Sequence, residues 1–153
     1  MAIPQLEYDR SLLGKPIPAG TFTVSKEGIL AFCSAVGESN PLYTDEEFAR
    51  RQGHPALVAP PTYPNLFIRH LGRPGVIAAP LRQRMHAGQA VEPLRPIYAG
   101  DTLTANTRLK DVYAKTGRTG TMAFIVWETT FTNQRGEEVA RVRESFMARL
   151  KGE

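Results

Sequence analysis

The stretch of sequence that decides the fold lies at residues 32–49 and reads FCSAVGESNPLYTDEEFA. It connects two predicted helices. The first begins at Ser25, a good N-cap, and ends at Gly37. The second opens with a capping box formed by Thr44 and Glu47. Two short helices joined by a tight turn are therefore expected. The first should present one apolar face, made of Ile29, Phe32, Cys33 and Val36.

The second half of the chain alternates apolar and polar residues, as half-buried strands do. Strands are predicted at residues 84–94, from Leu103, at 122–131 and from Ala140, with glycine-containing hairpin turns at 115–120 and 133–137. The strand at 122–131 is apolar on both faces and should be central. The residues expected to share one face of the preceding strand are Leu103, Ala105, Leu109 and Tyr113.

A third helix is predicted to open between Pro60 and Pro64 and to end at Gly72. Its inward residues should be Leu66, Phe67, and Leu71 or His70. A meander of long antiparallel strands needs a helix to cover one face. We therefore expect the α+β hot-dog fold, an antiparallel sheet wrapped around a long central helix, as a single domain over residues 1–153. Such a sheet leaves open edges, which predicts a dimer.

Composition limits the possible partners and compartment. The chain has 153 residues, a formal net charge of +4 and one cysteine, Cys33. Its basic residues are dispersed, which argues against nucleic acid as a ligand. It contains no apolar run long enough to cross a membrane and no recognisable signal peptide, so we expect a cytoplasmic protein without a membrane partner. One cysteine permits no internal disulfide, and no metal-ligand spacing is present.

Three blocks of sequence carry a resemblance to a known family. They are the Gly37–Ala49 stretch, the Val58-Ala-Pro-Pro-Thr62 segment, and His86-Ala-Gly-Gln89 followed by Arg95-Pro-Ile-Tyr-Ala-Gly-Asp101. In this order they resemble the MaoC-like (R)-specific enoyl-thioester hydratases and dehydratases, specifically the N-terminal, fatty-acid-synthase-like dehydratase subfamily. The family signature reads Gly-Asp-x-Asn-Pro-x-His, followed after a spacer by Ala. The positions that fit it are Gly37, Asn40, Pro41, Asp45 and Ala49.

The resemblance fails at the two residues that perform the family's chemistry. The catalytic Asp falls on Glu38, whose carboxylate is one methylene further out, and the catalytic His falls on Tyr43. A phenol with a pKa near ~10 replaces an imidazole near ~6.5, so very little of it is ionised at neutral pH. The glycine whose N–H binds the thioester oxygen falls on Pro61, which has no N–H. Thr62 is the nearest alternative donor.

Each candidate residue also has an ordinary structural explanation. Asn40-Pro41 is a common turn dipeptide, Glu38 can be a solvated loop carboxylate, and Tyr43 a packing aromatic. The strand residue His86 can be a hydrogen-bonded structural histidine, and His54 is expected at the surface. With these alternatives open, the candidate catalytic residues are Glu38, Tyr43 and His86, and the candidate substrate-binding residues are Asn40, Pro41, Ala59, Pro60, Pro61, Thr62 and Gly88.

Tyrosine at the histidine position is usual in this subfamily, whose members often pair with a separate catalytic hot-dog domain. The resemblance therefore implies a subunit of a 3-hydroxyacyl-thioester dehydratase or enoyl-CoA hydratase that holds the acyl chain while a partner supplies the Asp and His. Its partner would be a second copy or a catalytic MaoC-like subunit. No cofactor is expected, since CoA or an acyl-carrier protein carries the substrate. The rival hypotheses are a self-sufficient hydro-lyase with a modified site and a non-enzymatic acyl-thioester-binding module.

Overall fold

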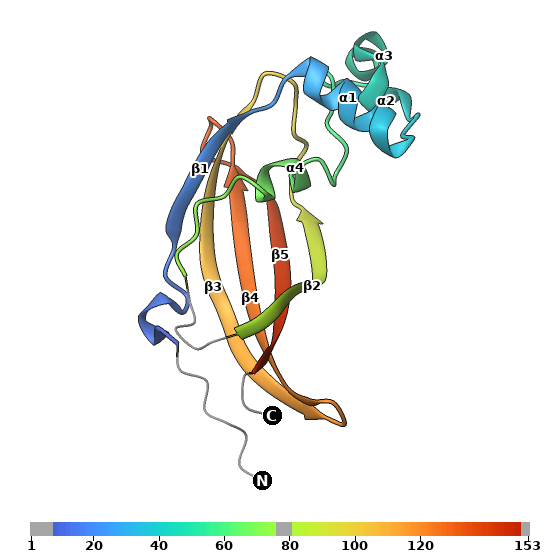
Figure 1. Cartoon of the computed structure of the whole chain (residues 1–153). Coiled ribbons are helices and arrows are strands. Elements are labelled where there is room, and N and C mark those ends of the chain that lie inside the picture. Colours follow the sequence, from blue (N-terminus) through green and yellow to red (C-terminus); the bar gives the residue numbers. More distant parts are fainter. Residues whose placement is uncertain (1–7, 76–80, 151–153) are drawn as a thin grey trace.

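The computed structural model describes residues 8–75 and 81–150. Its centre is one five-stranded antiparallel sheet with the strand order β1-β3-β4-β5-β2 (Figure 1). The strands are β1 (Ile17–Thr23), β2 (Leu81–Pro93), β3 (Thr102–Gly117), β4 (Gly120–Thr132) and β5 (Glu138–Leu150). The meander β3-β4-β5 and both of its hairpin turns are confirmed, and β4 is central as its two apolar faces predicted.

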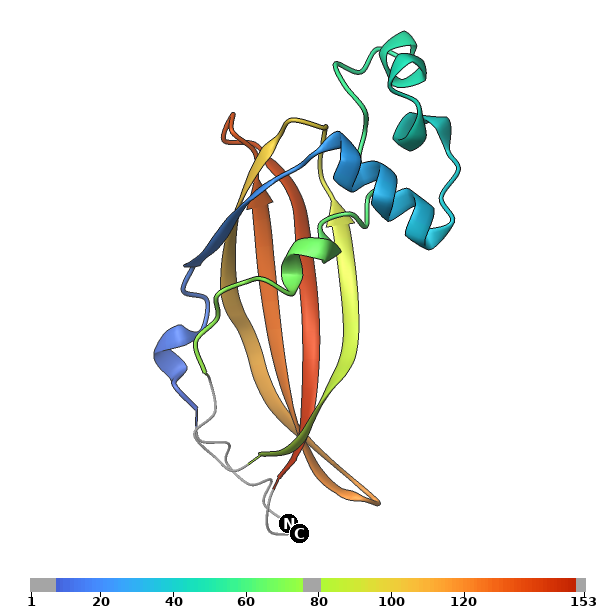
Figure 2. The same ribbon diagram turned by 45° about the horizontal axis from the view of Figure 1, so that its top comes forward.

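Five helical segments precede the meander: the 3-10 turn η1 (Arg10–Leu12) and the helices α1 (Lys26–Val36), α2 (Pro41–Thr44), α3 (Glu46–Arg51) and α4 (Asn65–Ile68). Figures 1 and 2 show α1, α2 and α3 grouped at one end of the sheet, whereas α4 lies over its face. Within the described ranges, no helix is long and apolar enough to cross a membrane.

The first helix confirms its predicted ends. The hydroxyl of Ser25 accepts a hydrogen bond from Gly28 N–H at 2.9 Å, and Gly37 closes α1 with a left-handed φ of 73°. Ile29 and Cys33 are buried, but the prediction was wrong for Val36, which is 60% exposed. Val36 is the last residue of α1, at the end of the helix that projects beyond the sheet (Figure 2).

The capping box was also predicted one residue too early. Thr44 is the last residue of α2, and its hydroxyl donates to Asn40 O at 3.1 Å. The N-cap of α3 is Asp45, whose carboxylate accepts from Phe48 N–H at 3.1 Å. Asp45 is therefore both the C-cap of α2 and the N-cap of α3.

The helix that faces the sheet differs from the long central helix that we expected. The segment over the sheet, α4, has four residues. Residues 60–65 form turns, with Tyr63 N–H bonded to Pro60 O and Asn65 N–H to Thr62 O, and Pro64 has no N–H to donate to a helix that begins before it. Ile68 is its buried residue, whereas Leu66, which we predicted to face inward, is 40% exposed.

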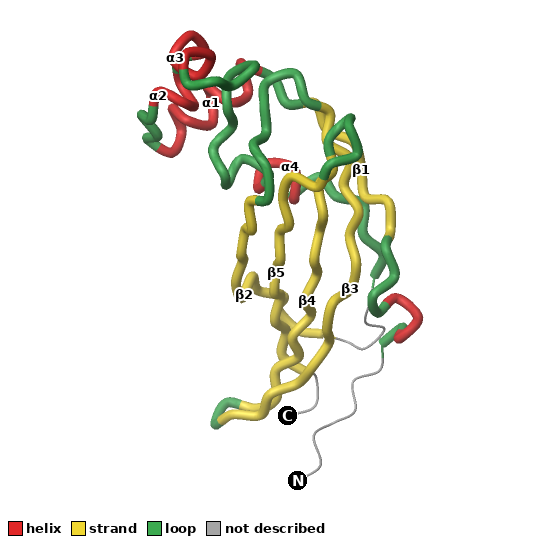
Figure 3. Tube along the Cα trace, turned by 180° about the vertical axis from the view of Figure 1, so that it is seen from behind, coloured by secondary structure: helices red, strands yellow, loops and turns green. Residues whose placement is uncertain are grey.

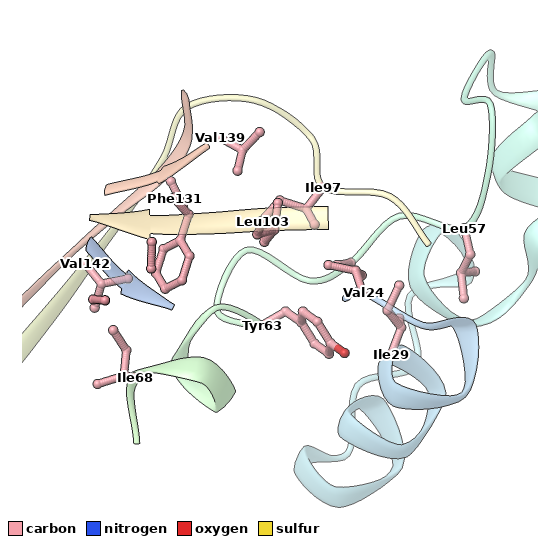
Figure 4. Close-up of a cluster of buried hydrophobic side chains, with 14 of the residues drawn as sticks. Val24, Ile29, Leu57, Tyr63, Ile68, Ile97, Leu103, Phe131, Val139 and Val142 are labelled. Carbon is pink, nitrogen blue, oxygen red and sulfur yellow. The ribbon is translucent and has the colours of Figure 1, made fainter. Parts of the chain in front are cut away.

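The face of the sheet toward α4, called the inner face below, carries two apolar clusters. The larger one joins α1 and α4 to strand residues such as Leu103, Phe131 and Val142, as Figure 4 shows. Phe131 lies near the stacked rings of Phe22 and Phe67, at centroid distances of 6.5 and 6.2 Å. The smaller cluster, further along the strands, contains Leu109, Val112, Ile125 and Trp127.

A β-bulge explains one wrong prediction on β3. The pairing of β3 with β4 shifts between Leu109 and Asp111, which adds a residue to β3. Side chains beyond the bulge change face. Val112 is therefore buried beside Leu109, and Tyr113 instead stacks on Phe124, with ring centroids 5.0 Å apart, on the outer face.

The outer face of the sheet, seen in Figure 3 with α4 on its far side, holds a buried carboxylate. Glu128 is 4% exposed because Arg108, Lys110 and Arg143 fold over it. Burial raises the pKa of Glu128, but hydrogen bonds from these three cations more than offset burial and hold the pKa at about 2, below its ordinary value of 4.5.

We expect Glu128→Gln to lower the free energy of unfolding at pH 7 by on the order of 2 kcal/mol, since the three cations are partly exposed and screened. A carboxylate with a depressed pKa stabilises the folded state above its unfolded pKa. Its contribution should therefore disappear as the pH falls from about 4.5 toward about 2. Urea titrations at pH 7 and pH 2.5 measure this. Glu92→Gln, an exposed carboxylate 3.9 Å from Arg141, is the control. An equal loss at both pH values would contradict the prediction.

Candidate functional site

A pocket of about 290 Å³ opens at the end of the sheet where α1, α2 and α3 are grouped. Its walls are two segments, residues 58–61 and 93–97, and its remaining lining residues are Tyr43, Val139 and Ala140. The walls are tied together, since Ala59 N–H donates to Ile97 O at 2.8 Å and Ala99 N–H donates to Leu57 O at 2.9 Å. The lining is mostly aliphatic, so the pocket suits an apolar group.

The turn that presents Tyr43 to this pocket is built by the signature residues. The Asn40 side chain caps α2 by accepting from Leu42 N–H at 3.0 Å. The Glu38 carboxylate accepts from Asn40 N–H at 2.8 Å, and Pro41 starts the helix. Tyr43, on this helix, is half-buried and lines the pocket, whereas Glu38, Asn40 and Pro41 do not line it. In this structure the three residues hold the turn.

The wall at residues 58–61 offers a ligand no free backbone N–H. Val58 N–H donates to Leu42 O at 3.2 Å, and Ala59 N–H is used by Ile97 O. The next two residues, Pro60 and Pro61, have none. Thr62, the alternative donor, is exposed and does not line the pocket. A thioester oxygen placed against these four residues would thus meet no backbone donor.

Two candidate residues lie elsewhere. His86 and Gly88 are on β2, where His86 pairs with Phe146 and packs edge-on against its ring at a centroid distance of 5.4 Å. Pro93, which lines the pocket, is seven residues further, roughly 20 Å along a strand. The structure therefore brings Tyr43, Ala59, Pro60 and Pro61 to one pocket and leaves His86 and Gly88 outside it.

Sequence reasoning missed two polar residues near the pocket. Arg95 lines it, although only its place in the third block gave it any signal. His54, expected at the surface, is half-buried, and its Nδ1 lies 3.0 Å from the hydroxyl of Tyr98. Burial raises the pKa of Tyr98, and the nearby Asp101 adds to this effect. Asp101 itself is buried and accepts from Tyr98 N–H at 2.9 Å, which fixes the chain beyond the pocket wall.

Solved structures place this architecture among known dehydratases. The chain superposes on the C-terminally truncated HadBC (3R-hydroxyacyl-ACP dehydratase) complex from Mycobacterium tuberculosis with a TM-score of 0.70 and 25% identity, covering 89% of this chain and 96% of that one. It superposes on the MaoC-like dehydratase from Rhodospirillum rubrum with a TM-score of 0.70 and 23% identity, covering 92% and 94%. The fold is the hot-dog fold, as predicted.

Sequence comparisons also relate the chain to dehydratases. A UPF0336 protein of Streptomyces coelicolor is 34% identical over 119 residues, which cover 73% of this chain and 78% of that protein. Residues 11–142 match the family model of the FAS1-like dehydratase domain region. The chain therefore belongs to the FAS1-like dehydratase-domain family and, within it, is a relative of the UPF0336 proteins.

Proposed function

We propose that this protein is a subunit of a 3-hydroxyacyl-thioester dehydratase or (R)-specific enoyl-CoA hydratase. Its pocket at Tyr43 holds the acyl group, and a partner hot-dog subunit supplies the catalytic Asp and His. The substrate is a thioester of CoA or of an acyl-carrier protein, and no cofactor takes part. We assign the complex to the cytoplasm.

The observation that carries this proposal is the lack of catalytic groups around an otherwise suitable pocket. Hydration of an enoyl thioester needs an acid and base near neutrality and N–H donors for the developing oxyanion. The pocket offers a phenol, Tyr43, where the family has histidine, and residues 58–61 offer no free N–H. An apolar pocket of this size remains able to hold a short acyl group.

A partner subunit is supported by an open edge of the sheet, that of β2. Strand β2 pairs with β5 on one side and, within the described part of the chain, with no strand on the other. Exposed edges invite pairing with another sheet. One structural relative is itself a dehydratase complex, HadBC. We therefore propose a heterodimer with a catalytic MaoC-like subunit, or a homodimer, formed across β2.

The test is turnover of a short enoyl-CoA by the purified chain, alone and with a MaoC-like subunit that carries the Asp–His pair. Alone, the chain should turn over at least about 100-fold more slowly than a typical enzyme's ~10 per second. Adding it should raise the turnover of the partner, and the two should co-elute in size-exclusion chromatography.

The two rival functions give different results in the same experiment. Turnover near ~10 per second by the pure chain would make it a self-sufficient hydro-lyase, and Glu38→Ala and Tyr43→Phe would then test its modified site. Partner turnover that is independent of this chain, together with thioester binding by the chain, would indicate a non-enzymatic binding module.

A further inference from the structure

The pocket at Tyr43 is lined by one residue with a cationic side chain, and the other lining residues are apolar apart from Tyr43. Of its twelve lining residues, all within the described ranges, Arg95 is the only cation and none is an Asp or Glu. The others are aliphatic residues, prolines and Tyr43. A purely hydrocarbon ligand gains nothing from a guanidinium beside it, because partial desolvation of that charge costs free energy. The lining therefore suits a ligand that is apolar along most of its length and anionic at one end.

The backbone and the side chain of Arg95 are both held in place. Its N–H and that of Leu94 donate to Val139 O, at 3.2 and 2.9 Å, and the following Pro96 restricts Arg95 to extended conformations. The Arg95 Nε lies 3.3 Å from Glu137 Oε2, which orients the guanidinium.

The terminal nitrogens of Arg95 remain available. Within residues 8–75 and 81–150, neither makes a hydrogen bond, Glu137 is the one carboxylate within 4.0 Å of the guanidinium, and the side chain is 55% exposed. Glu137 is also bound by Arg135 Nε at 2.7 Å and by Asn133 Nδ2 at 3.2 Å. Glu137 is therefore shared between two guanidiniums, and it does not saturate Arg95. A half-exposed guanidinium that is paired with Glu137 at Nε can also bind a carboxylate through its two terminal nitrogens, one to each oxygen.

The position of Arg95 limits which anion can reach it. Arg95 is part of the pocket wall, so the anion must follow directly on a short apolar segment. The phosphates of CoA or of a carrier protein do not meet this condition, because the long pantetheine arm separates them from the acyl group. A carboxylate at the far end of a short acyl chain does meet it. At about 290 Å³, the pocket is at the small end of ligand sites, which also favours a short chain.

We propose that Arg95 binds the free carboxylate of a short dicarboxylic acyl group, so that the pocket selects thioesters of dicarboxylic acids over those of fatty acids. This inference rests on the proposed function, since it assumes that the pocket at Tyr43 holds the acyl group.

The test compares glutaryl-CoA with pentanoyl-CoA, which share CoA and a five-carbon chain and differ by the terminal carboxylate. Isothermal titration calorimetry on the full chain should give glutaryl-CoA a dissociation constant roughly tenfold lower. Arg95→Gln should remove this preference by weakening the binding of glutaryl-CoA roughly tenfold more than that of pentanoyl-CoA. Arg95→Lys keeps the charge but loses the planar fork, and should retain part of the preference. Arg118→Gln, the same change in the exposed β3–β4 turn, is the matched control and should retain all of it.

The remaining outcomes separate this inference from the proposed function. Equal binding of both thioesters would overturn the role of Arg95 and leave the acyl-binding role intact. A preference that survives in Arg95→Gln, or that Arg118→Gln also removes, would place the carboxylate elsewhere and overturn it too. Binding of neither thioester would overturn both proposals. Circular dichroism of each variant confirms that the fold is unchanged.

Discussion

Replacing Glu144 by glutamine is expected to lower the free energy of unfolding by about 3–5 kcal/mol, because it leaves a buried guanidinium without its counter-charge. Glu144 lies on the inner face of β5, and its side chain is 5% exposed. It is paired with Arg73, whose side chain is 15% exposed and lies 5.4 Å from the ring of Trp127. Arg73 Nη2 also donates to the hydroxyl of Thr129 at 3.3 Å, and within the described part of the chain its buried Nε has no partner.

Removing both Arg73 and Glu144 together should change the free energy of unfolding little. A buried ion pair loses much of its Coulombic gain to desolvation, and the unpartnered Arg73 Nε adds to that cost. Arg73→Met combined with Glu144→Met should therefore be within about 1 kcal/mol of the native protein, or more stable than it. This contrast between the single and double changes separates a buried pair from a surface one.

Urea titrations followed by the fluorescence of Trp127, the only tryptophan, measure both effects. The control is Glu138→Gln, since Glu138 is half exposed and pairs with Arg141 at 2.6 Å. An exposed pair of this kind should contribute no more than about 1 kcal/mol. A loss in Glu144→Gln as small as that in Glu138→Gln would show that solvent reaches the inner face there.

The elements that the sequence could predict are those specified by local chemistry. Ser25 and Gly37 set the ends of α1 through a side-chain cap and a left-handed residue, and both are where the sequence puts them. The two glycine-containing hairpin turns, predicted at 115–120 and 133–137, were also predictable from sequence, and with them the meander, although pairing of β3 with β4 continues to Gly117 and Gly120. In each case residues close together in the chain determine the structure.

The elements that it could not predict depend on residues far apart in the sequence. The bulge at Leu109 follows from how β3 pairs with β4, and no residue type at that position predicts it. Glu144 reads as an interruption of the apolar alternation until Arg73, 71 residues away, is seen beside it. Patterns within a short stretch of sequence carry no information about such contacts.

The pocket at Tyr43 shows the same division. The family signature could be recognised because its residues lie close together in the chain, and these residues do build the turn that presents Tyr43. Its second wall, residues 93–97, joins the site through hydrogen bonds to residues 57–59 and to Val139, which are far from it in the sequence. Arg95 therefore could not be recognised as a pocket residue. Conversely, His86 was included because of its block, although β2 carries it far from the pocket.

Restoring the family's catalytic groups should restore hydration only when a backbone donor is restored with them. Glu38→Asp keeps a carboxylate that can accept from Asn40 N–H, since aspartate readily bonds the backbone two residues on. Tyr43→His places an imidazole, which titrates near neutrality, in the pocket wall. This double variant should gain little, because residues 58–61 still offer no free N–H to the thioester oxygen.

Adding Pro61→Gly to the double variant supplies one N–H in that wall. Loss of a single oxyanion donor in other enzymes costs roughly 100- to 1000-fold in turnover. We therefore expect the added change to raise enoyl-CoA hydration on the order of 100-fold on the double-variant background, and to have little effect on the native one. A gain that depends on the background in this way indicates that the donor and the introduced imidazole act on one bound substrate.

Pro96→Gly on the same background is the matched control, because Pro96 also lines the pocket but lies on the opposite wall. Pro96→Gly exposes a backbone N–H away from the thioester oxygen, and it should give no gain in the rate of enoyl-CoA hydration. An equal gain from either proline would mean that backbone flexibility, and not an aimed donor, limits the reaction. Each variant must keep the circular dichroism and elution volume of the native protein. A folded triple variant that hydrates no faster than background would show that the defect extends beyond these three positions, and the non-enzymatic binding module would then become the better account of this chain.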